Sequence, residues 1–225
     1  MLDAKAYLQD LISALRNAFG ERLMYVGLQG SYLRGEATES SDIDPMVVID
    51  GLTCKDLDTY RNIIKQLPQP ELSCGFLCGK SELTHWNALE MSHLLHTTRD
   101  EYGVLADLVP AYDERDIRSF IQMSIGNLYH GLCHSYVHAD AFDAILPQLC
   151  KGVFFILQNL HYLTRGEFIA TKAELLQRLT GKDRAVLDRA LDLNKGIPHD
   201  FSDSFELLFT WCQETLQNLA VSTSG

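Results

Sequence analysis

The sequence lacks a long hydrophobic run. No apolar stretch reaches the roughly 18 residues that a membrane-spanning helix needs. Residues 1–5 are not the start of a secretory signal, because they mix an acidic and a basic side chain with apolar ones. We therefore expect no membrane segment and a cytoplasmic location.

Cysteines at zinc-binding spacings are also missing. The six cysteines are scattered among apolar neighbours, and only Cys74 and Cys78 lie close together in the sequence. No second Cys/His pair stands at the distance along the chain that a closed zinc site requires. The pattern favours buried, reduced thiols rather than a zinc site.

Positive charge is scarce. The chain of 225 residues has 19 Lys and Arg against 30 Asp and Glu, a formal net charge of −11. Binding a long nucleic acid needs clustered basic residues that neutralise phosphates, so we expect no such partner. An acidic surface would instead attract a small cationic molecule.

One stretch of the chain carries the pattern of a chemical site. Gly30-Ser31 follows the apolar segment 23–28, and Asp42 and Asp44 lead into a second apolar segment, 46–49. Glycine allows the backbone to approach a ligand closely, and backbone amides in such a turn can face phosphate oxygens. The segment is therefore expected to form a phosphate-binding turn.

The spacing of the two aspartates points to a metal ion. Side chains alternate along an extended segment, so Asp42 and Asp44 leave the same face while Ile43 points into the core. Two carboxylates on one face can share a divalent cation. Both aspartates are predicted metal ligands.

Together these residues resemble the DNA polymerase β-like nucleotidyltransferase superfamily. The residues that carry the resemblance are Gly30, Ser31, Gly35, Ser41, Asp42 and Asp44, followed by the apolar strand. Within the superfamily, the chain looks most like the small nucleotidyltransferases and the aminoglycoside adenylyltransferases. The motif covers about a tenth of the chain, with a looser likeness in the C-terminal half.

The resemblance implies ATP as co-substrate and two Mg²⁺ ions held by the aspartates. It implies nucleotide-binding roles for Gly30, Ser31, Arg34 and Ser41. A third carboxylate, on the strand beside the Asp-x-Asp strand, completes the metal site or takes a proton in that superfamily. Glu71 is the matching residue here, and Glu82 in the following loop is the alternative.

The fold expected is α+β. An N-terminal nucleotidyltransferase domain, residues 1–110, would have a small mixed sheet flanked by helices, and residues 111–225 would form an all-α bundle that binds the acceptor. In the first domain the patterns predict helices at 2–19, 53–67 and 85–96 and strands at 23–28, 46–49, 71–77 and 101–108. In the second they predict helices at 116–138, 140–164 with a bend at Pro147, 171–179, 183–193 and 202–219.

Two further positions bear on the site. Thr171 and Glu174 form a capping box, which puts Lys172 at the first position of a helix. A positive charge there opposes the helix dipole unless an anion meets it. The aminoglycoside adenylyltransferases have a similarly placed lysine that contacts the triphosphate, so Lys172 is a predicted nucleotide ligand; a solvated surface lysine is the alternative. His93 and His96 are expected to be surface or hydrogen-bonded histidines rather than a metal pair.

Three functions fit this sequence. The first is transfer of a nucleoside monophosphate, AMP from ATP, to a hydroxyl of a small acceptor such as an aminoglycoside, with antibiotic resistance as the implied role. The second is the same chemistry on a protein or another molecule. The third is a catalytically silent relative that binds nucleotide or a partner protein. The oligomeric state is left open.

Overall fold

The computed structural model describes residues 2–139 and 142–221. The chain forms two compact units, Met1–Tyr112 and Asp113–Gly225. The first contains a β-sheet with helices, and the second is built from helices. The expected α+β class, with a small mixed sheet followed by a largely helical half, is confirmed.

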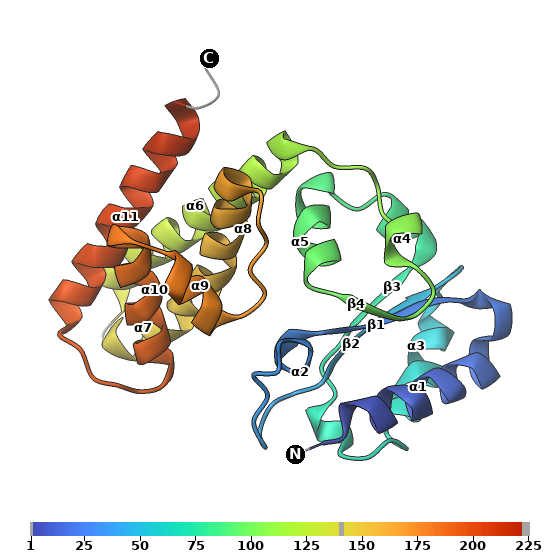
Figure 1. The fold of residues 1–225 in the computed structure, drawn as a ribbon. Helices are drawn as coiled ribbons and strands as arrows, with labels where there is room; N and C mark the ends of the chain where they lie inside the picture. Colours follow the sequence, from blue (N-terminus) through green and yellow to red (C-terminus); the bar gives the residue numbers. More distant parts are fainter. Residues whose placement is uncertain (1, 140–141, 222–225) are drawn as a thin grey trace. The chain divides into compact units, whose positions relative to one another are not determined.

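A four-stranded mixed sheet forms the centre of the N-terminal unit (Figure 1). Its strands are β1 (Leu23–Gln29), β2 (Asp44–Ile49), β3 (Phe76–Gly79) and β4 (Arg99–Tyr102), in the order β3-β2-β1-β4. β1 is antiparallel to β2 and β4, whereas β2 and β3 are parallel. β2 and β3 therefore start at the same end of the sheet, and Asp44 is the first residue of β2.

Helices cover both faces of this sheet (Figure 1). The helices of this unit are α1 (Ala4–Phe19), α2 (Gly30–Arg34), α3 (Cys54–Ile64), α4 (Lys80–Thr84) and α5 (Met91–His96). On the face of α1 and α3, Leu11, Val26 and Val47 belong to a large buried cluster. On the other face, Tyr25 and Met46 belong to a smaller cluster that includes side chains of α4 and α5.

Side-chain caps fix where α1 and α3 begin. Asp3 accepts hydrogen bonds from two backbone amides in the first turn of α1. Thr53 and Asp56 form a full capping box at α3, as their spacing indicates. The Asp56 carboxylate also forms an ion pair with Arg22, with an Nη2–Oδ1 distance of 2.6 Å. This pair links α3 to the residue that precedes β1. These contacts satisfy amides that would otherwise have no partner at the helix ends.

Two predicted strands have different bounds in the structure. The strand expected at 71–77 is a 3₁₀ turn, Pro70–Leu72, followed by an isolated bridge from Ser73 to Ile43, and β3 begins only at Phe76. Proline fixes its own φ and has no amide proton, so it favours the turn over a strand. The strand expected at 101–108 is β4, which starts earlier and ends before Gly103, whose φ is 77°.

Two other local predictions were wrong. The helix expected at 85–96 is interrupted: α4 ends at Thr84, a 3₁₀ turn spans Ala88–Glu90, and α5 begins at Met91. Asn87 accepts a hydrogen bond from the Leu89 amide, the kind of local contact that competes with a continuous helix. The segment expected as a Gly-Ser turn is the short helix α2, with Gly35 as its left-handed cap.

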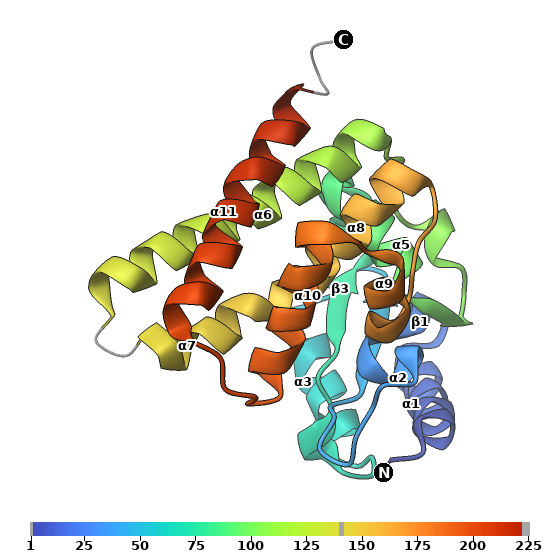
Figure 2. The same ribbon diagram turned by 60° about the vertical axis from the view of Figure 1, so that its left-hand side comes forward.

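The C-terminal unit consists of packed helices (Figure 2). They are α6 (Glu114–His138), α7 (Phe142–Leu149), α8 (Val153–Arg165), α9 (Lys172–Arg178), α10 (Gly181–Asn194) and α11 (Phe201–Val221). Within the described residues, the single helix expected at 140–164 is divided by a 3₁₀ turn at Cys150–Gly152 rather than only bent at Pro147. Helix α6 packs against α8 and α11, and α10 packs against α8 and α11. Buried Leu157, Leu187 and Trp211 supply part of the core.

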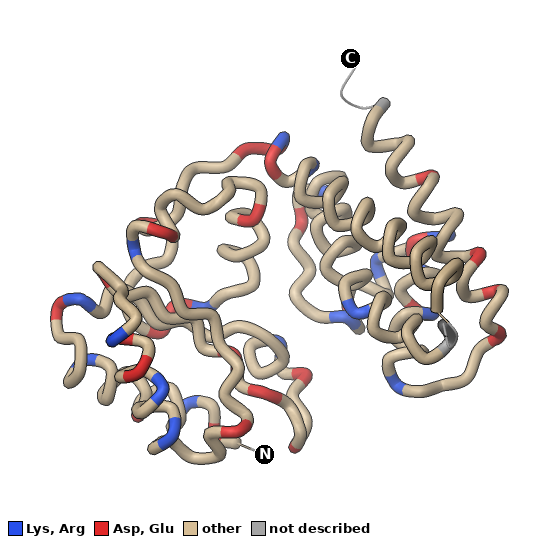
Figure 3. The backbone as a smooth tube through the Cα atoms, turned by 180° about the vertical axis from the view of Figure 1, so that it is seen from behind, with Lys and Arg blue, Asp and Glu red and all other residues tan. Residues whose placement is uncertain are grey.

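Charged residues are spread over both units rather than gathered in one basic area. Figure 3 shows Lys and Arg scattered among Asp and Glu along the backbone. Among the described residues, no helix combines the length and the apolar character needed to cross a membrane. The motif residues lie at the end of the sheet where β2 begins.

Candidate active site

Asp42 and Asp44 lie at the start of β2, on the face of the sheet that also carries α4 and α5. Ile43 between them is fully buried in the opposite cluster, with 0% exposure. Asp44 pairs across the sheet with Gln29, and Met46, two residues on, is buried in the cluster of the α5 face. Alternation along the strand therefore directs both carboxylates to one face, as the sequence predicts.

Gly30 gives the Asp44 carboxylate its space. Gly30 has a φ of 70°, a backbone conformation that side chains disfavour. A Cβ atom at this position would collide with Asp44 Oδ2. Both the backbone conformation and the close approach therefore call for glycine, and the glycine and the aspartate form one structural unit.

The environment of Asp44 disfavours its charged form. Burial raises the pKa of the Asp44 carboxyl, and the nearby Asp42 carboxylate raises it further, while the Arg34 guanidinium acts in the opposite direction. Repulsion between two neighbouring carboxylates is relieved when a cation binds between them. The electrostatics thus fit a cation site.

Arg34 is a basic residue of the motif segment. It lies at the end of α2 and forms an ion pair with Glu36, Nε to Oε2 2.9 Å, with side-chain exposures of 13% and 21%. Its charge also lowers the pKa of His93. The Arg34 charge therefore acts on the pKa values of both Asp44 and His93.

The loop between α2 and β2 is closed by Ser41. Its hydroxyl accepts a hydrogen bond from the Thr38 amide at 2.8 Å, and its own amide donates to the Thr38 carbonyl. In α2, the Ser31 carbonyl accepts from the Glu36 amide at 2.9 Å. Ser31 and Ser41 thus lie on either side of the connection that brings Asp42 and Asp44 to the sheet.

The two candidate third carboxylates lie at different ends of β3. Exposed Glu71 belongs to the 3₁₀ turn that precedes the Ser73–Ile43 bridge, near the aspartate end. Glu82 is in the first turn of α4, next to Gly79 at the other end of β3. β3 has four residues, so its two ends are about 13 Å apart at the usual rise per residue. Of the two, only Glu71 lies at the same end of the strands as Asp44.

Cys74 occupies the position opposite Asp44 in the strand register. Ile43 pairs with Ser73 and Met46 with Phe76, so Asp44 faces Cys74 across the parallel pair. Its thiol is free and exposed. Sequence reasoning treated this cysteine as a buried apolar residue; only the register of the two strands reveals its place beside the aspartates.

His93 of α5 also belongs to this face. Burial lowers its pKa, the neighbouring His96 and Arg34 act in the same direction, and together they bring the pKa to about 4. His93 is therefore neutral at pH 7. The sequence suggested only a surface or hydrogen-bonded histidine, because the separation between residues 34 and 93 hides their proximity.

Lys172 begins α9 in the C-terminal unit. Thr171 caps the helix by accepting from the Glu174 amide at 3.3 Å. The Lys172 ammonium lies 5.8 Å from the centre of the Phe154 ring, within the range of a cation–π contact. The helix start that the sequence predicts is thus present, with the lysine beside an aromatic face of α8.

Asp42 and Asp44 are the residues of the N-terminal unit that could hold a metal. Within residues 2–139 and 142–221, no group of three or more His, Cys, Asp or Glu side chains is arranged for a metal ion. Mg²⁺ commonly binds one or two carboxylates and takes its other ligands from substrate phosphates and water. Two carboxylates at the end of a strand suit that mode of binding.

Comparison with known proteins gives this geometry a class. Residues 11–73, which run from α1 to the Ser73 bridge, match the family model described as a nucleotidyltransferase domain. No match was found among curated proteins. The matched segment contains Gly30 and the paired aspartates, and the match supports an enzyme of the nucleotidyltransferase class.

The fold of the chain also resembles that of a solved adenyltransferase. It is similar to the crystal structure of spectinomycin adenyltransferase AAD(9) from Enterococcus faecialis with ATP and spectinomycin, with a TM-score of 0.58 and 14% sequence identity. The match covers 95% of this chain and 99% of that chain. At this identity the likeness concerns the fold, and the residues of each site must be argued from this chain.

Proposed function

We propose that this enzyme transfers AMP from ATP to a hydroxyl group of a small acceptor. The observation that carries the proposal is the pair Asp42 and Asp44, which share one face of β2 against Gly30. The nucleotidyltransferase family match supports the general reaction. The cytoplasm, where ATP is available, is the proposed compartment.

Asp42 and Asp44 are the proposed ligands of two Mg²⁺ ions. Their mutual repulsion and the burial of Asp44 favour cation binding at this point. When bound, the ions would orient the triphosphate and neutralise charge on the attacking and leaving oxygens.

Residues around the aspartates are proposed to hold the triphosphate. Backbone groups at Gly30 and Ser31 lie where the chain turns from β1 into α2, and Arg34 ends that helix. On the other side, the Ser41 hydroxyl closes the loop by accepting a hydrogen bond from the Thr38 amide. Lys172 is proposed as a further ligand of the phosphates, since its position at a helix start favours a nearby anion.

The proposed reaction requires a proton acceptor. The hydroxyl oxygen of the small-molecule substrate forms a bond to the α-phosphorus of ATP. The bond from that phosphorus to the oxygen that bridges to the β-phosphate breaks, and pyrophosphate leaves. The hydroxyl proton passes to a base, for which Glu71 is proposed because it lies at the aspartate end of β3. Glu82 is less suited because it lies beside Gly79 at the far end.

A cationic acceptor such as an aminoglycoside is the proposed substrate class. The net charge of −11 favours a cation, and the similar adenyltransferase was crystallised with spectinomycin. The helical unit is proposed to supply the acceptor-binding surface.

The test measures transfer of label from α-³²P-ATP to a panel of aminoglycosides, with and without Mg²⁺. We expect a labelled antibiotic and pyrophosphate, both lost when EDTA removes the metal. If the label appeared on a protein and on no antibiotic, the acceptor would be a protein, which is the second function stated above. ATP binding without transfer to any acceptor would contradict the catalytic assignment.

A further inference from the structure

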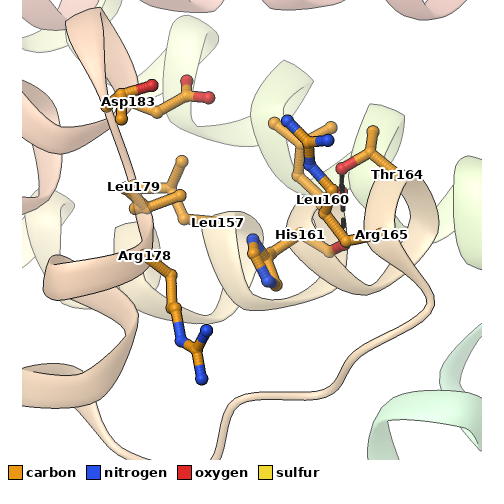
Figure 4. Close-up of a pocket in the computed structure, with 9 residues that line it drawn as sticks. Leu157, Leu160, His161, Thr164, Arg165, Arg178, Leu179 and Asp183 are labelled. Carbon is orange, nitrogen blue, oxygen red and sulfur yellow. Dashed lines mark hydrogen bonds between the residues drawn. The ribbon is translucent and has the colours of Figure 1, made fainter.

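A small polar pocket lies among three helices of the C-terminal unit (Figure 4). Its volume is about 100 Å³, and it is lined by α8, the end of α9 and the start of α10. The polar lining includes His161 and Arg165 of α8, Arg178 of α9 and Asp183 of α10. In Figure 4 the His161 ring projects between the two arginines.

His161 has an unsatisfied buried nitrogen in this pocket. The residue is 9% exposed, and its Nε2 atom has no hydrogen-bond partner. The Glu167 carboxylate lies 3.9 Å from Nε2, which is too far for a hydrogen bond. Leaving a buried polar atom unpaired is costly, so the nitrogen is available to a ligand that enters the pocket.

Arg178 is also held only loosely. The distance from its Nη2 to Glu167 Oε1 is 3.7 Å, and both side chains are 52% exposed. Exposed ion pairs of this length contribute little. Glu167 is therefore a weak competitor that an incoming anion can displace from both Arg178 and His161.

The remaining polar groups of the lining are already engaged. Trp211 Nε1 donates to Asp183 Oδ1 at 2.7 Å, which draws that carboxylate towards α11. The Thr164 hydroxyl donates to the Leu160 carbonyl at 2.8 Å. The lining has two guanidinium groups and the Asp183 carboxylate, and Glu167 beside His161 and Arg178 is the second carboxylate near the pocket.

The size of the pocket limits what can enter. Sites for drug-sized ligands measure roughly 300–1,000 Å³, so this one is too small for a nucleotide. A second pocket of about 300 Å³ adjoins it and shares Leu160, Thr164 and Asp183 as walls. One anionic group fits the small pocket, and an organic portion attached to it would extend into the larger one.

We propose that this pocket binds a phosphate group, with His161 and Arg178, which share Glu167 as a neighbour, as its donors. Guanidinium groups match phosphate geometry, and hydrogen bonds to a charged acceptor are stronger than neutral ones. The phosphate is either inorganic phosphate or the phosphate of a small monoester. The site uses no residue of the Asp42–Asp44 motif and does not depend on the reaction proposed there.

Calorimetric titration of the full chain with inorganic phosphate tests the site. We expect saturable 1:1 binding that weakens at least tenfold in Arg178→Gln, because this variant loses a charged donor. Arg184→Gln is the matched control, since Arg184 is an exposed arginine of α10 outside the lining. The control should bind phosphate like the wild type, and thermal unfolding checks that all variants are folded.

Two further variants sharpen the assignment. Glu167→Gln removes the competing carboxylate and should tighten phosphate binding several-fold. In the wild type, the ¹⁵N NMR signal of His161 Nε2 should shift as phosphate is added. Tighter binding of a monoester such as phosphoserine than of inorganic phosphate would identify the ester as the source, whereas equal or weaker binding would identify inorganic phosphate.

The two proposals can fail separately. Asp44→Asn should abolish nucleotidyl transfer and leave phosphate binding at His161 unchanged. No saturable binding to the wild type, or equal weakening in Arg178→Gln and Arg184→Gln, would overturn the pocket assignment. Loss of phosphate binding in Asp44→Asn would show that the anion binds at the aspartate site instead.

Discussion

The two faces of the sheet differ in what they bury. The face covered by α1 and α3 packs apolar side chains, among them Leu11, Ile43 and Val47, into one large cluster. The other face has a smaller cluster and a row of polar groups: the Gln29 amide donates to Thr98 at 2.8 Å, and the Tyr25 hydroxyl to Asp100 at 2.7 Å. One face supplies the larger apolar cluster, and the other carries the proposed site.

This contrast is sharpest over three successive residues. Asp42 and Asp44 point to the polar face, and Ile43 between them is fully buried on the apolar face. Substitutions in this short segment should therefore separate activity from stability.

The largest effect is expected for Asp44→Asn. We expect nucleotidyl transfer to fall by more than about a hundredfold, because even residues that only support a metal ligand cost 10–100-fold. The measurement is the rate of pyrophosphate release from ATP. Asp50→Asn, an exposed aspartate beyond the other end of β2, is the control and should keep full activity.

The same variant should be more stable than the wild type at pH 7 without metal. The folded-state pKa of Asp44 is raised, so its ionised form is disfavoured in the native state and asparagine removes that cost. The gain should disappear as the pH falls below this pKa, because the wild-type carboxyl is then neutral too. A lower Tm of the variant at pH 7 would contradict the electrostatic account.

Ile43→Ala should show the opposite behaviour. Removing a fully buried side chain from the apolar face is expected to cost about 2–5 kcal/mol of unfolding free energy. Ile43→Val should cost only about 0.5–1.5 kcal/mol. Chemical denaturation measures both. If Ile43→Ala unfolded at the same denaturant concentration as the wild type, the apolar face would not be the main source of stability.

A pair of glycine variants tests the contact between α2 and Asp44. Gly30→Ala and Gly35→Ala both place a side chain at a φ of 70°, which costs about 1–2 kcal/mol. Only at residue 30 would the new Cβ also collide with the Asp44 carboxylate; at residue 35 nothing lies within 4 Å. We expect similar strain in both and loss of transfer only in Gly30→Ala. Equal activities of the two variants would count against the proposed role of Gly30.

The smallest effect concerns the ion pair between Arg22 and Asp56, at the start of α3. Arg22 and Thr53 hydrogen-bond to Asp56 and lower the pKa of its carboxyl. A depressed pKa means that the contribution to stability is present above the unfolded-state pKa of about 4 and is lost as the pH falls through the folded value. Asp56→Asn should therefore lower Tm at pH 7, and the difference from the wild type should shrink progressively as the pH falls below about 4. A pH-independent difference in Tm would argue against this ion pair.

Much of this architecture is local and could be predicted from the sequence. Short apolar runs bounded by turn residues predicted strands 23–28 and 46–49, and the Thr53–Asp56 spacing predicted the start of α3. Local signals also placed Gly30, Asp42 and Asp44 in one motif. These features depend on neighbours within a few residues.

The remaining parts of the site depend on contacts distant in sequence. The place of Cys74 opposite Asp44 follows from the register of two parallel strands, and that of His93 from how α5 packs on the sheet. No periodic pattern of residues in the sequence indicates the position of Cys74 or of His93. The helix expected at 85–96 was wrong because the capping contact of Asn87 outweighed its apolar spacing.

The register of β2 and β3 also makes the aspartate pair open to direct observation. Because Cys74 faces Asp44 and its thiol is free and exposed, a small thiol-specific fluorophore or spin label would sit next to the carboxylates. Cys54 is the other free and exposed thiol among the described residues and is replaceable by serine. A paramagnetic ion such as Mn²⁺ bound by the aspartates would broaden the signal of a label at Cys74, so cation binding could be followed without a substrate or turnover.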